Sequence, residues 1–234
     1  FDGMKYPQPY IAVRFMTFSG FRSRWRAFVG MGLNLRHKIS GKGLIFGKML
    51  GSGAGEGFSV WPDWGTYAWF TVFDTEENAL SFFASDNIFN DLVACSSSVF
   101  GWDAIPLKCH GTWNGINPFG ELSEIKHSGQ LAVLTRASIK KSQALRFWWN
   151  VPAASRNISN HTGLIFSKGV GEYPLLEQAT LSLWNSTEEL NEFAYKSRQH
   201  APVVKKTRKF NWYSEELFLR MMVIKKYGKM IDKE

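Results

Sequence analysis

A short string occurs twice in this chain in nearly the same form. Residues 43–48 read GLIFGK and residues 163–168 read GLIFSK, so the two strings begin 120 positions apart. A second, weaker similarity follows in the same order, between residues 72–82 and residues 183–193, 111 positions apart. Similar strings in the same order indicate one structural unit present twice, and two copies favour a pair of units over a solenoid. The unequal separations predict a longer loop in the first copy.

Both copies have the same predicted order of strands and helices, β-α-β-β-α-β. In the first copy we expect strands at 10–18, 43–49, 67–73 and 99–108, and helices at 23–38 and from 74 to about 95. In the second copy we expect strands at 131–139, 163–169, 178–184 and near 217–224, and helices at 141–151 and from Ser186 onward.

This order of elements predicts an α+β fold. Each copy is expected to be a ferredoxin-like unit, whose single sheet has one uncovered face and open edges. Two related units can bury those faces against each other, so we predict tandem duplicated ferredoxin-like units that form a fused α/β barrel. The predicted division is a first unit at 4–110, a linker at 111–129 and a second unit at 130–228. One chain can close such a barrel, so a homo-oligomer is compatible with the fold but not required.

The composition is that of a globular protein with a large core, since 44% of the residues are hydrophobic and 19 are Phe. No run approaches the roughly 18 apolar residues of a membrane helix, and the first residues do not resemble a secretion signal. We therefore expect a cytoplasmic protein. Cys95 and Cys109 are too few for a disulfide framework and lack zinc-site spacing, so buried thiols are expected. The chain has no recognisable Ser-His-Asp or His-Glu-x-x-His pattern.

Positive charge is concentrated near the C-terminus. Residues 196–234 hold eleven Lys or Arg and four Asp or Glu, out of a total net charge of +8. A basic face can meet nucleic acid, an anionic membrane surface or an acidic ligand group, and charge alone does not choose among them. The simplest interpretation is a solvated helix face, and no other feature points to nucleic acid. If the substrate lies in a membrane, we expect this region to hold the protein at the membrane surface.

A glycine-rich segment at 51–57 is followed by several aromatic residues. It lacks the Lys-Ser/Thr of a phosphate-binding Walker loop, and a Trp-Pro-Asp-Trp string follows where a dinucleotide site would need a helix. A long hairpin loop over a pocket is the better interpretation, with Trp61 and Trp64 as a lid and Phe58 beside them.

His200 is the one histidine placed where chemistry would use it. His200, Val203, Val204 and Thr207 follow helical spacing, so the imidazole is expected on the inward face of a helix. Pro202 is tolerated only in the first turn of that helix, where the helix dipole keeps the imidazole neutral. A neutral inward imidazole suits iron ligation, although a hydrogen-bonded core histidine is the commoner case.

Two resemblances bear on this choice. Residues 193–200 resemble the segment in which haem-degrading monooxygenases of the dimeric α+β barrel superfamily place their proximal histidine, whereas residues 82–92 of the first copy contain no histidine. A closer resemblance, to the spheroidene monooxygenase family of carotenoid ketolases, covers most of the chain. It is carried by residues 48–58, 134–137, 146–148, 152–155, 169–172 and 211–217.

The resemblance implies oxygen insertion into a carotenoid, with haem as the oxygen-activating group and O2 and an electron donor as co-substrates. We expect His200 to ligate the iron, and Arg208 and Trp212 to contact the haem. Arg136 lies in an apolar strand and, if inward, needs an anionic or polar partner, so a distal or propionate role is expected. The aromatic residues expected to line the substrate pocket are Phe147, Trp148, Tyr213, Trp64 and Phe58.

Other functions remain open from the sequence. One is a cofactor-free oxygenase of the same barrel superfamily, in which the substrate carbanion reacts with oxygen. Another is a non-catalytic carrier of haem or an apolar pigment. A third is haem-dependent dehydration, for example of aldoximes, which related barrels carry out.

Overall fold

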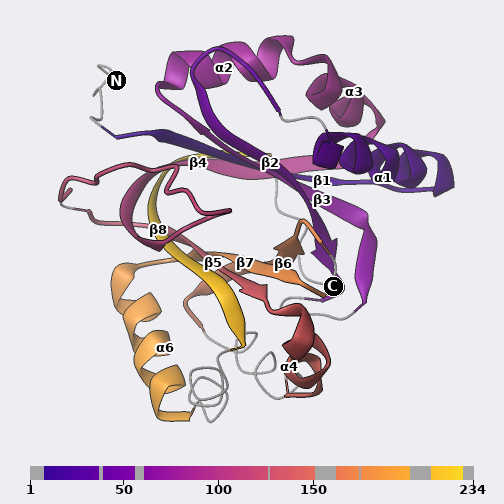
Figure 1. Cartoon of the computed structure of the whole chain (residues 1–234). Helices are drawn as coiled ribbons and strands as arrows, with labels where there is room; N and C mark the ends of the chain where they lie inside the picture. Colours follow the sequence, from indigo (N-terminus) through magenta and orange to yellow (C-terminus); the bar gives the residue numbers. More distant parts are fainter. Residues whose placement is uncertain are drawn as a thin grey trace.

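Eight antiparallel strands close into one barrel. The computed structural model of the protein describes residues 8–36, 39–55, 61–125, 127–150, 162–173, 175–200 and 212–228. The strands follow one another around the barrel in the order β1-β3-β2-β6-β7-β5-β8-β4. Helices α1, α2 and α3 lie on one side of the barrel, and α4 and α6 lie on the opposite side (Figure 1).

The predicted α+β barrel is confirmed, and each half of the chain has the predicted order of elements. The first half consists of β1 (Tyr10–Thr17), α1 (Phe21–Arg36), β2 (Leu44–Gly53), β3 (Pro62–Phe73), α2 (Glu76–Ser85), α3 (Asn87–Cys95) and β4 (Ser98–Gly111). The second half consists of β5 (Leu131–Ile139), η1 (Lys141–Gln143), α4 (Ala144–Asn150), β6 (Leu164–Gly171), β7 (Glu177–Trp184), α6 (Thr187–His200) and β8 (Tyr213–Tyr227). None of the helices in the described ranges is long and apolar enough to cross a membrane.

The single helix predicted from residue 74 to about 95 is wrong, because two helices occupy this stretch. Asp86 has an extended backbone conformation and is both the last cap of α2 and the first cap of α3. Its carboxylate accepts a hydrogen bond from the Phe89 amide at 2.7 Å. A side chain that caps a new helix competes with continuation of the old one, which explains the break.

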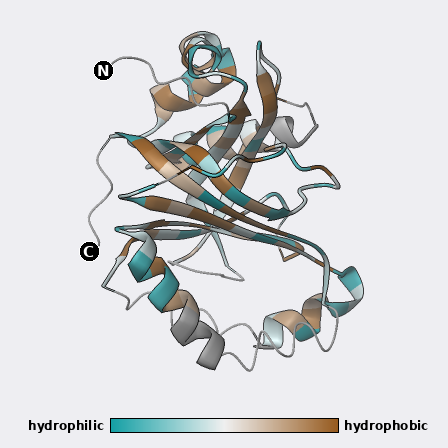
Figure 2. Cartoon of the chain, turned by 90° about the vertical axis from the view of Figure 1, so that its left-hand side faces the viewer, coloured by the Kyte–Doolittle hydropathy of each residue, from teal (hydrophilic) through white to brown (hydrophobic). Residues whose placement is uncertain are grey.

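Alternate residues of each strand fill the barrel interior with apolar side chains. Figure 2 shows the hydrophobic residues concentrated along the strands. The segment predicted as a linker contributes to this interior, since Trp113 and Phe119 are each only 1% exposed. The Trp113 ring lies 5.0 Å from the Phe46 ring and 5.4 Å from the Phe70 ring. Residues between β4 and β5 therefore form part of the core as well as the connection.

The hairpins β2–β3 and β6–β7 have the same register. Met49 pairs with Trp69 in the first half, and Gly169 pairs with Thr180 in the second. Both hairpins also have a β-bulge at the same place in the repeated string, after Leu44 and after Leu164. Positions in the two halves can therefore be compared one by one.

The outer face of the first-half sheet is filled by large side chains. Met16, Met49, Tyr67 and Trp69 are buried there in one cluster. The Trp69 ring packs 5.4 Å from the Phe89 ring of α3. Helices α2 and α3 thus seal this face through direct side-chain packing.

Replacing Trp69 by Thr, the residue at the equivalent position of the second half, should remove most of this contact. We expect the free energy of unfolding to fall by about 3–5 kcal/mol, because the cavity left beneath α3 has no side chain to fill it. Urea denaturation followed by circular dichroism would measure the loss. The exposed Trp25→Thr control should change stability by less than about 0.5 kcal/mol. Equal effects of the two substitutions would contradict the proposed packing of the first half.

Candidate functional site

At four positions the outer face of the second-half sheet carries a small side chain where the first half carries a large one. Thr135, Thr180 and Gly169 form one row across β5, β7 and β6. Ser182 and Ser167 form the next row, and Ala137 lies beside the first. We call these six residues the small-residue face.

The contrast with the first half is large at matching positions. Matching strand positions hold Ala137 in the second half and Met16 in the first. In the same way, Thr180 matches Trp69 and Gly169 matches Met49. Interiors pack close to crystal density, so a sheet that loses this much bulk must be covered by something else. The outer face of the second half is therefore covered by something other than large side chains of its own sheet.

Two hydroxyl groups of the small-residue face support this interpretation. Ser167 and Thr180 are buried, at 6% and 8% exposure. Within the described ranges, neither Ser167 Oγ nor Thr180 Oγ1 has a hydrogen-bond partner. A buried unpaired hydroxyl costs about 1–3 kcal/mol, so such groups usually meet a ligand or an ordered water.

Helix α6 runs from the edge of this face to His200. Its first half is anchored by Leu190 and by Phe193, whose ring lies 5.0 Å from that of Trp184. From Leu190 the helix continues for ten residues, about 15 Å, and ends at His200. The side chain of His200 and the residues Arg208 and Phe58 lie outside what the structure describes, so their predicted roles stay predictions.

Arg136 lies on the opposite face of the same sheet and points into the barrel, as predicted for an inward arginine. Its guanidinium is 2.7 Å from a Glu215 oxygen and 3.4 Å from a Glu177 oxygen. It also stacks 5.1 Å from the centre of the Trp113 ring. The anionic partners of Arg136 are therefore carboxylates of this chain. The catalytic role of Arg136 stays a prediction.

Two further charged residues complete this partly buried network at one end of the barrel. Lys48 forms an ion pair with Glu172. Glu172 also accepts a hydrogen bond from the indole N–H of Trp113 at 2.7 Å. A network of alternating charges therefore closes this end of the barrel over an apolar interior. Its members are Lys48, Arg136, Glu172, Glu177 and Glu215.

The carboxyl groups of this network have opposite pKa shifts. Burial by itself raises the pKa of Glu215, but hydrogen bonds from the Gly115 amide, the Thr112 hydroxyl and Arg136 outweigh it and lower the pKa to about 2. Burial and the neighbouring negative charge of Glu172 instead raise the pKa of Glu177. Glu215 is therefore the permanent anion of the network, while Glu177 protonates more readily.

The structure brings together four aromatic residues that the sequence predicted near the site. The Phe147 ring lies 5.3 Å from that of Trp148, 5.9 Å from that of Trp212 and 5.8 Å from that of Tyr213. Phe147 and Trp212 are buried, and the indole N–H of Trp148 donates to the Leu175 carbonyl at 2.8 Å. The cluster fixes α4 against the start of β8. Its role as a substrate lining stays a prediction.

A cavity of about 480 Å³ lies where the two halves of the barrel meet. It is lined by α1, the ends of β2 and β3, and the β6–β7 connection, and includes Phe28, Trp64, Tyr67 and Leu175. Trp64, predicted as part of a lid, is 53% exposed at its edge. Gln178 also lines the cavity and pairs with Ala137, so the cavity reaches the border of the small-residue face.

The sequence predicted a pocket beside the 51–57 hairpin with Trp64 at its mouth, and the cavity lies there, but its other walls and most of the charged network were missed. Strand alternation alone would have located the network, because Lys48 lies between the inward residues Phe46 and Leu50. Glu215 likewise lies two residues before the inward Leu217. The cavity depends on how α1 meets the β6–β7 connection, and no local pattern reports that contact.

The fold is shared with a known class of α+β barrel proteins. A crystal structure of aldoxime dehydratase matches with a TM-score of 0.56 over 96% of this chain and 84% of that chain, at 10% identity. An aldoxime dehydratase in complex with butyraldoxime matches with a TM-score of 0.53 over 93% of this chain and 80% of that chain, also at 10% identity. At such low identity the likeness concerns the fold alone. No protein-family profile matches the chain.

Sequence relatives identify the family. Spheroidene monooxygenase of Rhodobacter capsulatus is 34% identical over 191 residues, which cover 81% of this chain and 79% of that protein. The spheroidene monooxygenases of Cereibacter sphaeroides and Rubrivivax gelatinosus are 33% and 31% identical, over 81% and 77% of this chain and 59% and 69% of those proteins. The chain belongs to the spheroidene monooxygenase family, as its motifs indicated, and is classed with the monooxygenases.

Glu215→Gln should destabilise the protein at neutral pH by about 2 kcal/mol, because Arg136 and three other donors lose an ionised acceptor. The pKa of Glu215 is lowered by folding, so its stabilisation is present above the ordinary carboxyl pKa of 4.5 and is lost as the pH falls towards about 2. The wild type and the variant should therefore converge in stability over that window. Urea denaturation at a series of pH values measures this.

Glu216→Gln is the matched control, since Glu216 is the next residue and is exposed. It should change stability by less than about 0.5 kcal/mol at any of these pH values. A constant difference between Glu215→Gln and wild type down to the lowest pH would contradict the assigned role of Glu215.

Proposed function

We propose that the protein is a haem-dependent monooxygenase that inserts oxygen into a carotenoid or a similar apolar terpenoid. The observation that carries the proposal is the small-residue face, with its two buried unpaired hydroxyls, on the half of the chain that contains His200. Family membership supports the oxygenase chemistry and the class of substrate. The shape and chemistry of the face support a flat cofactor.

The residues present fit a haem. Gly169, Thr180 and Ala137 have little side-chain bulk to oppose one face of a porphyrin, and the unpaired Ser167 and Thr180 hydroxyls would serve as hydrogen-bond donors to its propionate carboxylates. His200, at the end of α6, is the proposed iron ligand, and Arg208 and Trp212 are proposed to contact the haem edge. When bound, haem would supply the activation of O2, with electrons from an external donor. Arg136 remains proposed as a catalytic or propionate-binding residue.

The cavity at the junction of the two halves is the proposed substrate site. Aromatic and aliphatic side chains dominate its lining, which suits an apolar polyene. Gln178 connects it to the small-residue face, so a substrate end held in the cavity would lie beside the proposed cofactor. Trp64 and Tyr67 would exclude water and orient the chain, while Phe147, Trp148, Tyr213 and Phe58 would extend the apolar wall.

We also infer that the two halves are tandem ferredoxin-like copies that arose by duplication. The repeated string, the equal hairpin registers and the matching bulges support this history. In this view the first copy became a scaffold by filling its outer face with Trp69 and Met49. The second copy kept that face open for a ligand.

The proposal predicts that haem binding requires both His200 and the space above Thr180. Wild-type protein titrated with haemin should develop a Soret band. His200→Ala should weaken haemin affinity at least about tenfold, because the iron loses its ligand. Thr180→Trp should abolish the band without unfolding the protein, because the indole occupies the space of the porphyrin. Absorption spectroscopy at equal protein concentration measures both effects.

Two controls separate these effects from general damage. His110→Ala removes an exposed histidine on β4, and Thr180→Val keeps the size of the side chain while it removes the hydroxyl; both should retain the Soret band. A full Soret band in both His200→Ala and Thr180→Trp would refute the haem site. Product formation by haem-free protein would instead support a cofactor-free oxygenase. Haem binding without product under O2 and a reductant would support a carrier.

A further inference from the structure

Helix α1 and the start of β3 expose a continuous row of aromatic side chains. The Phe21 and Trp25 rings stack at 6.4 Å, the Trp25 and Phe28 rings lie 5.8 Å apart, and Phe28 meets Trp64 edge-on at 5.2 Å. Their exposed fractions are 82%, 56%, 42% and 53% in chain order. We call these four residues the aromatic ladder.

An ordinary amphipathic surface helix turns its large apolar side chains towards the core, whereas α1 turns them outward. Its inner face has small or slender residues, with Ala27 buried and Gly30 against Leu92 of α3. Its large aromatic residues face outward, although their burial would stabilise the fold by about 1.5–3 kcal/mol each. A contiguous exposed apolar surface of this kind usually marks a binding site.

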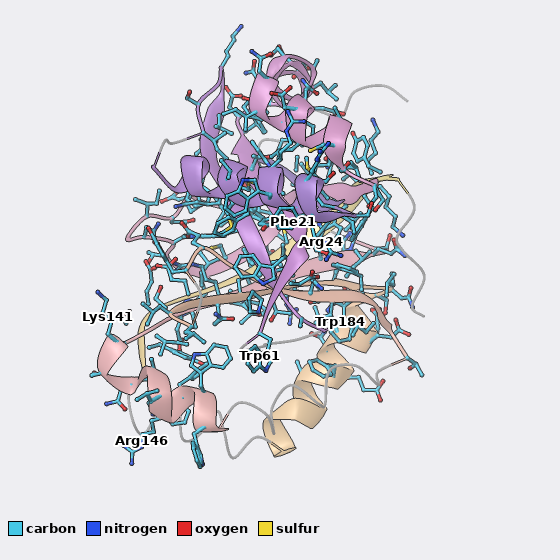
Figure 3. The ribbon with its side chains drawn as sticks, turned by 90° about the vertical axis from the view of Figure 1, so that its right-hand side faces the viewer. Phe21, Arg24, Trp61, Lys141, Arg146 and Trp184 are labelled. Atoms are coloured by element: carbon cyan, nitrogen blue, oxygen red, sulfur yellow. The ribbon has the colours of Figure 1, made fainter. Side chains whose placement is uncertain are left out.

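Positive charges accompany the aromatic ladder. Arg22, Arg24 and Arg26 alternate with its residues and are exposed, and the sequence of α1 contains no Asp or Glu. Phe21 and Arg24 lie on the same side of the molecule as Trp61 in Figure 3, with Lys141 and Arg146 below them. Aromatic side chains interleaved with cations suit the interface of an anionic lipid bilayer, where rings sit at headgroup depth and arginines meet phosphates.

The aromatic ladder also borders the cavity. Phe28 and Trp64 belong to the ladder and line the cavity where the halves meet. A surface that rested on a bilayer through the ladder would therefore hold the cavity mouth at the lipid. An apolar molecule dissolved in the bilayer could enter without crossing water.

We propose that the aromatic ladder and the arginines of α1 form a docking surface for an anionic lipid bilayer. This inference goes beyond the proposed function and does not require haem. A second copy of the chain fits the surface less well, because a twofold pair would bring Arg22 and Arg26 of both copies together. The basic C-terminal region was the sequence-based candidate for membrane contact, and six of its eleven Lys and Arg residues lie outside the described residues.

Vesicle sedimentation tests the proposal with the full chain and no added ligand. Wild type should bind vesicles of phosphatidylglycerol mixed with phosphatidylcholine, and should bind pure phosphatidylcholine vesicles much more weakly. Phe21→Ser combined with Trp25→Ser should weaken binding at least about tenfold. Arg22→Gln combined with Arg26→Gln should weaken it roughly thirtyfold, from the loss of two charges near an anionic surface, and added salt should reduce that difference.

Leu80→Ser combined with Ile88→Ser is the matched control, since these residues are 48% and 46% exposed on α2 and α3. It should bind as wild type does. All variants change exposed residues, and thermal melts would verify that they remain folded. Equal vesicle binding by the ladder variant and the control would overturn the proposal. The proposal would also be overturned if the wild type were a dimer, the ladder variant were a monomer, and neither protein bound vesicles.

Discussion

Strand alternation in a closed barrel gives every strand one side chain inside and the next outside, and the rest of this structure depends on it. The inside is filled by both halves together. The outside of each half must be covered separately, because the two outer faces point in opposite directions (Figure 1). The first half meets this requirement with Trp69 and Met49 against the helices. The second half presents Thr180 and Gly169 at the same positions, and the proposed ligand site is the consequence.

The same alternation separates two kinds of chemistry in the second half. Thr135 faces the proposed ligand, while its neighbour Arg136 faces the barrel and binds Glu215 and Glu177. A buried charge network is a weak source of stability, but each member is costly to leave unpaired. The charge network lies at the barrel end, where Trp113 covers it, and holds the β6–β7 connection in place. That connection forms one wall of the cavity, so the network positions the cavity as well as closing the core.

Much of the fold could be predicted from the sequence, because it follows from local periodicity and from the repeated string. The break at Asp86 was missed because a capping side chain interrupts an otherwise continuous helical pattern. The sequence indicated that Arg136 would need an anionic or polar partner if it pointed inward, but its carboxylate partners come from β7 and β8, far away in sequence. The small-residue face became visible only once strand registers aligned Trp69 with Thr180. The exposed aromatic ladder was missed because helical periodicity marks an apolar face without telling which way it points.

We expect the second half alone to bind a flat iron-containing cofactor on its outer face. Crystals of haemin-loaded protein, measured at the iron absorption edge, would test it directly through the anomalous difference map. One iron peak per chain, on the side of the sheet where Thr180 and Gly169 lie, is the predicted result. A peak inside the barrel, a peak over Trp69, or no peak in crystals that retain the haem colour would contradict the account.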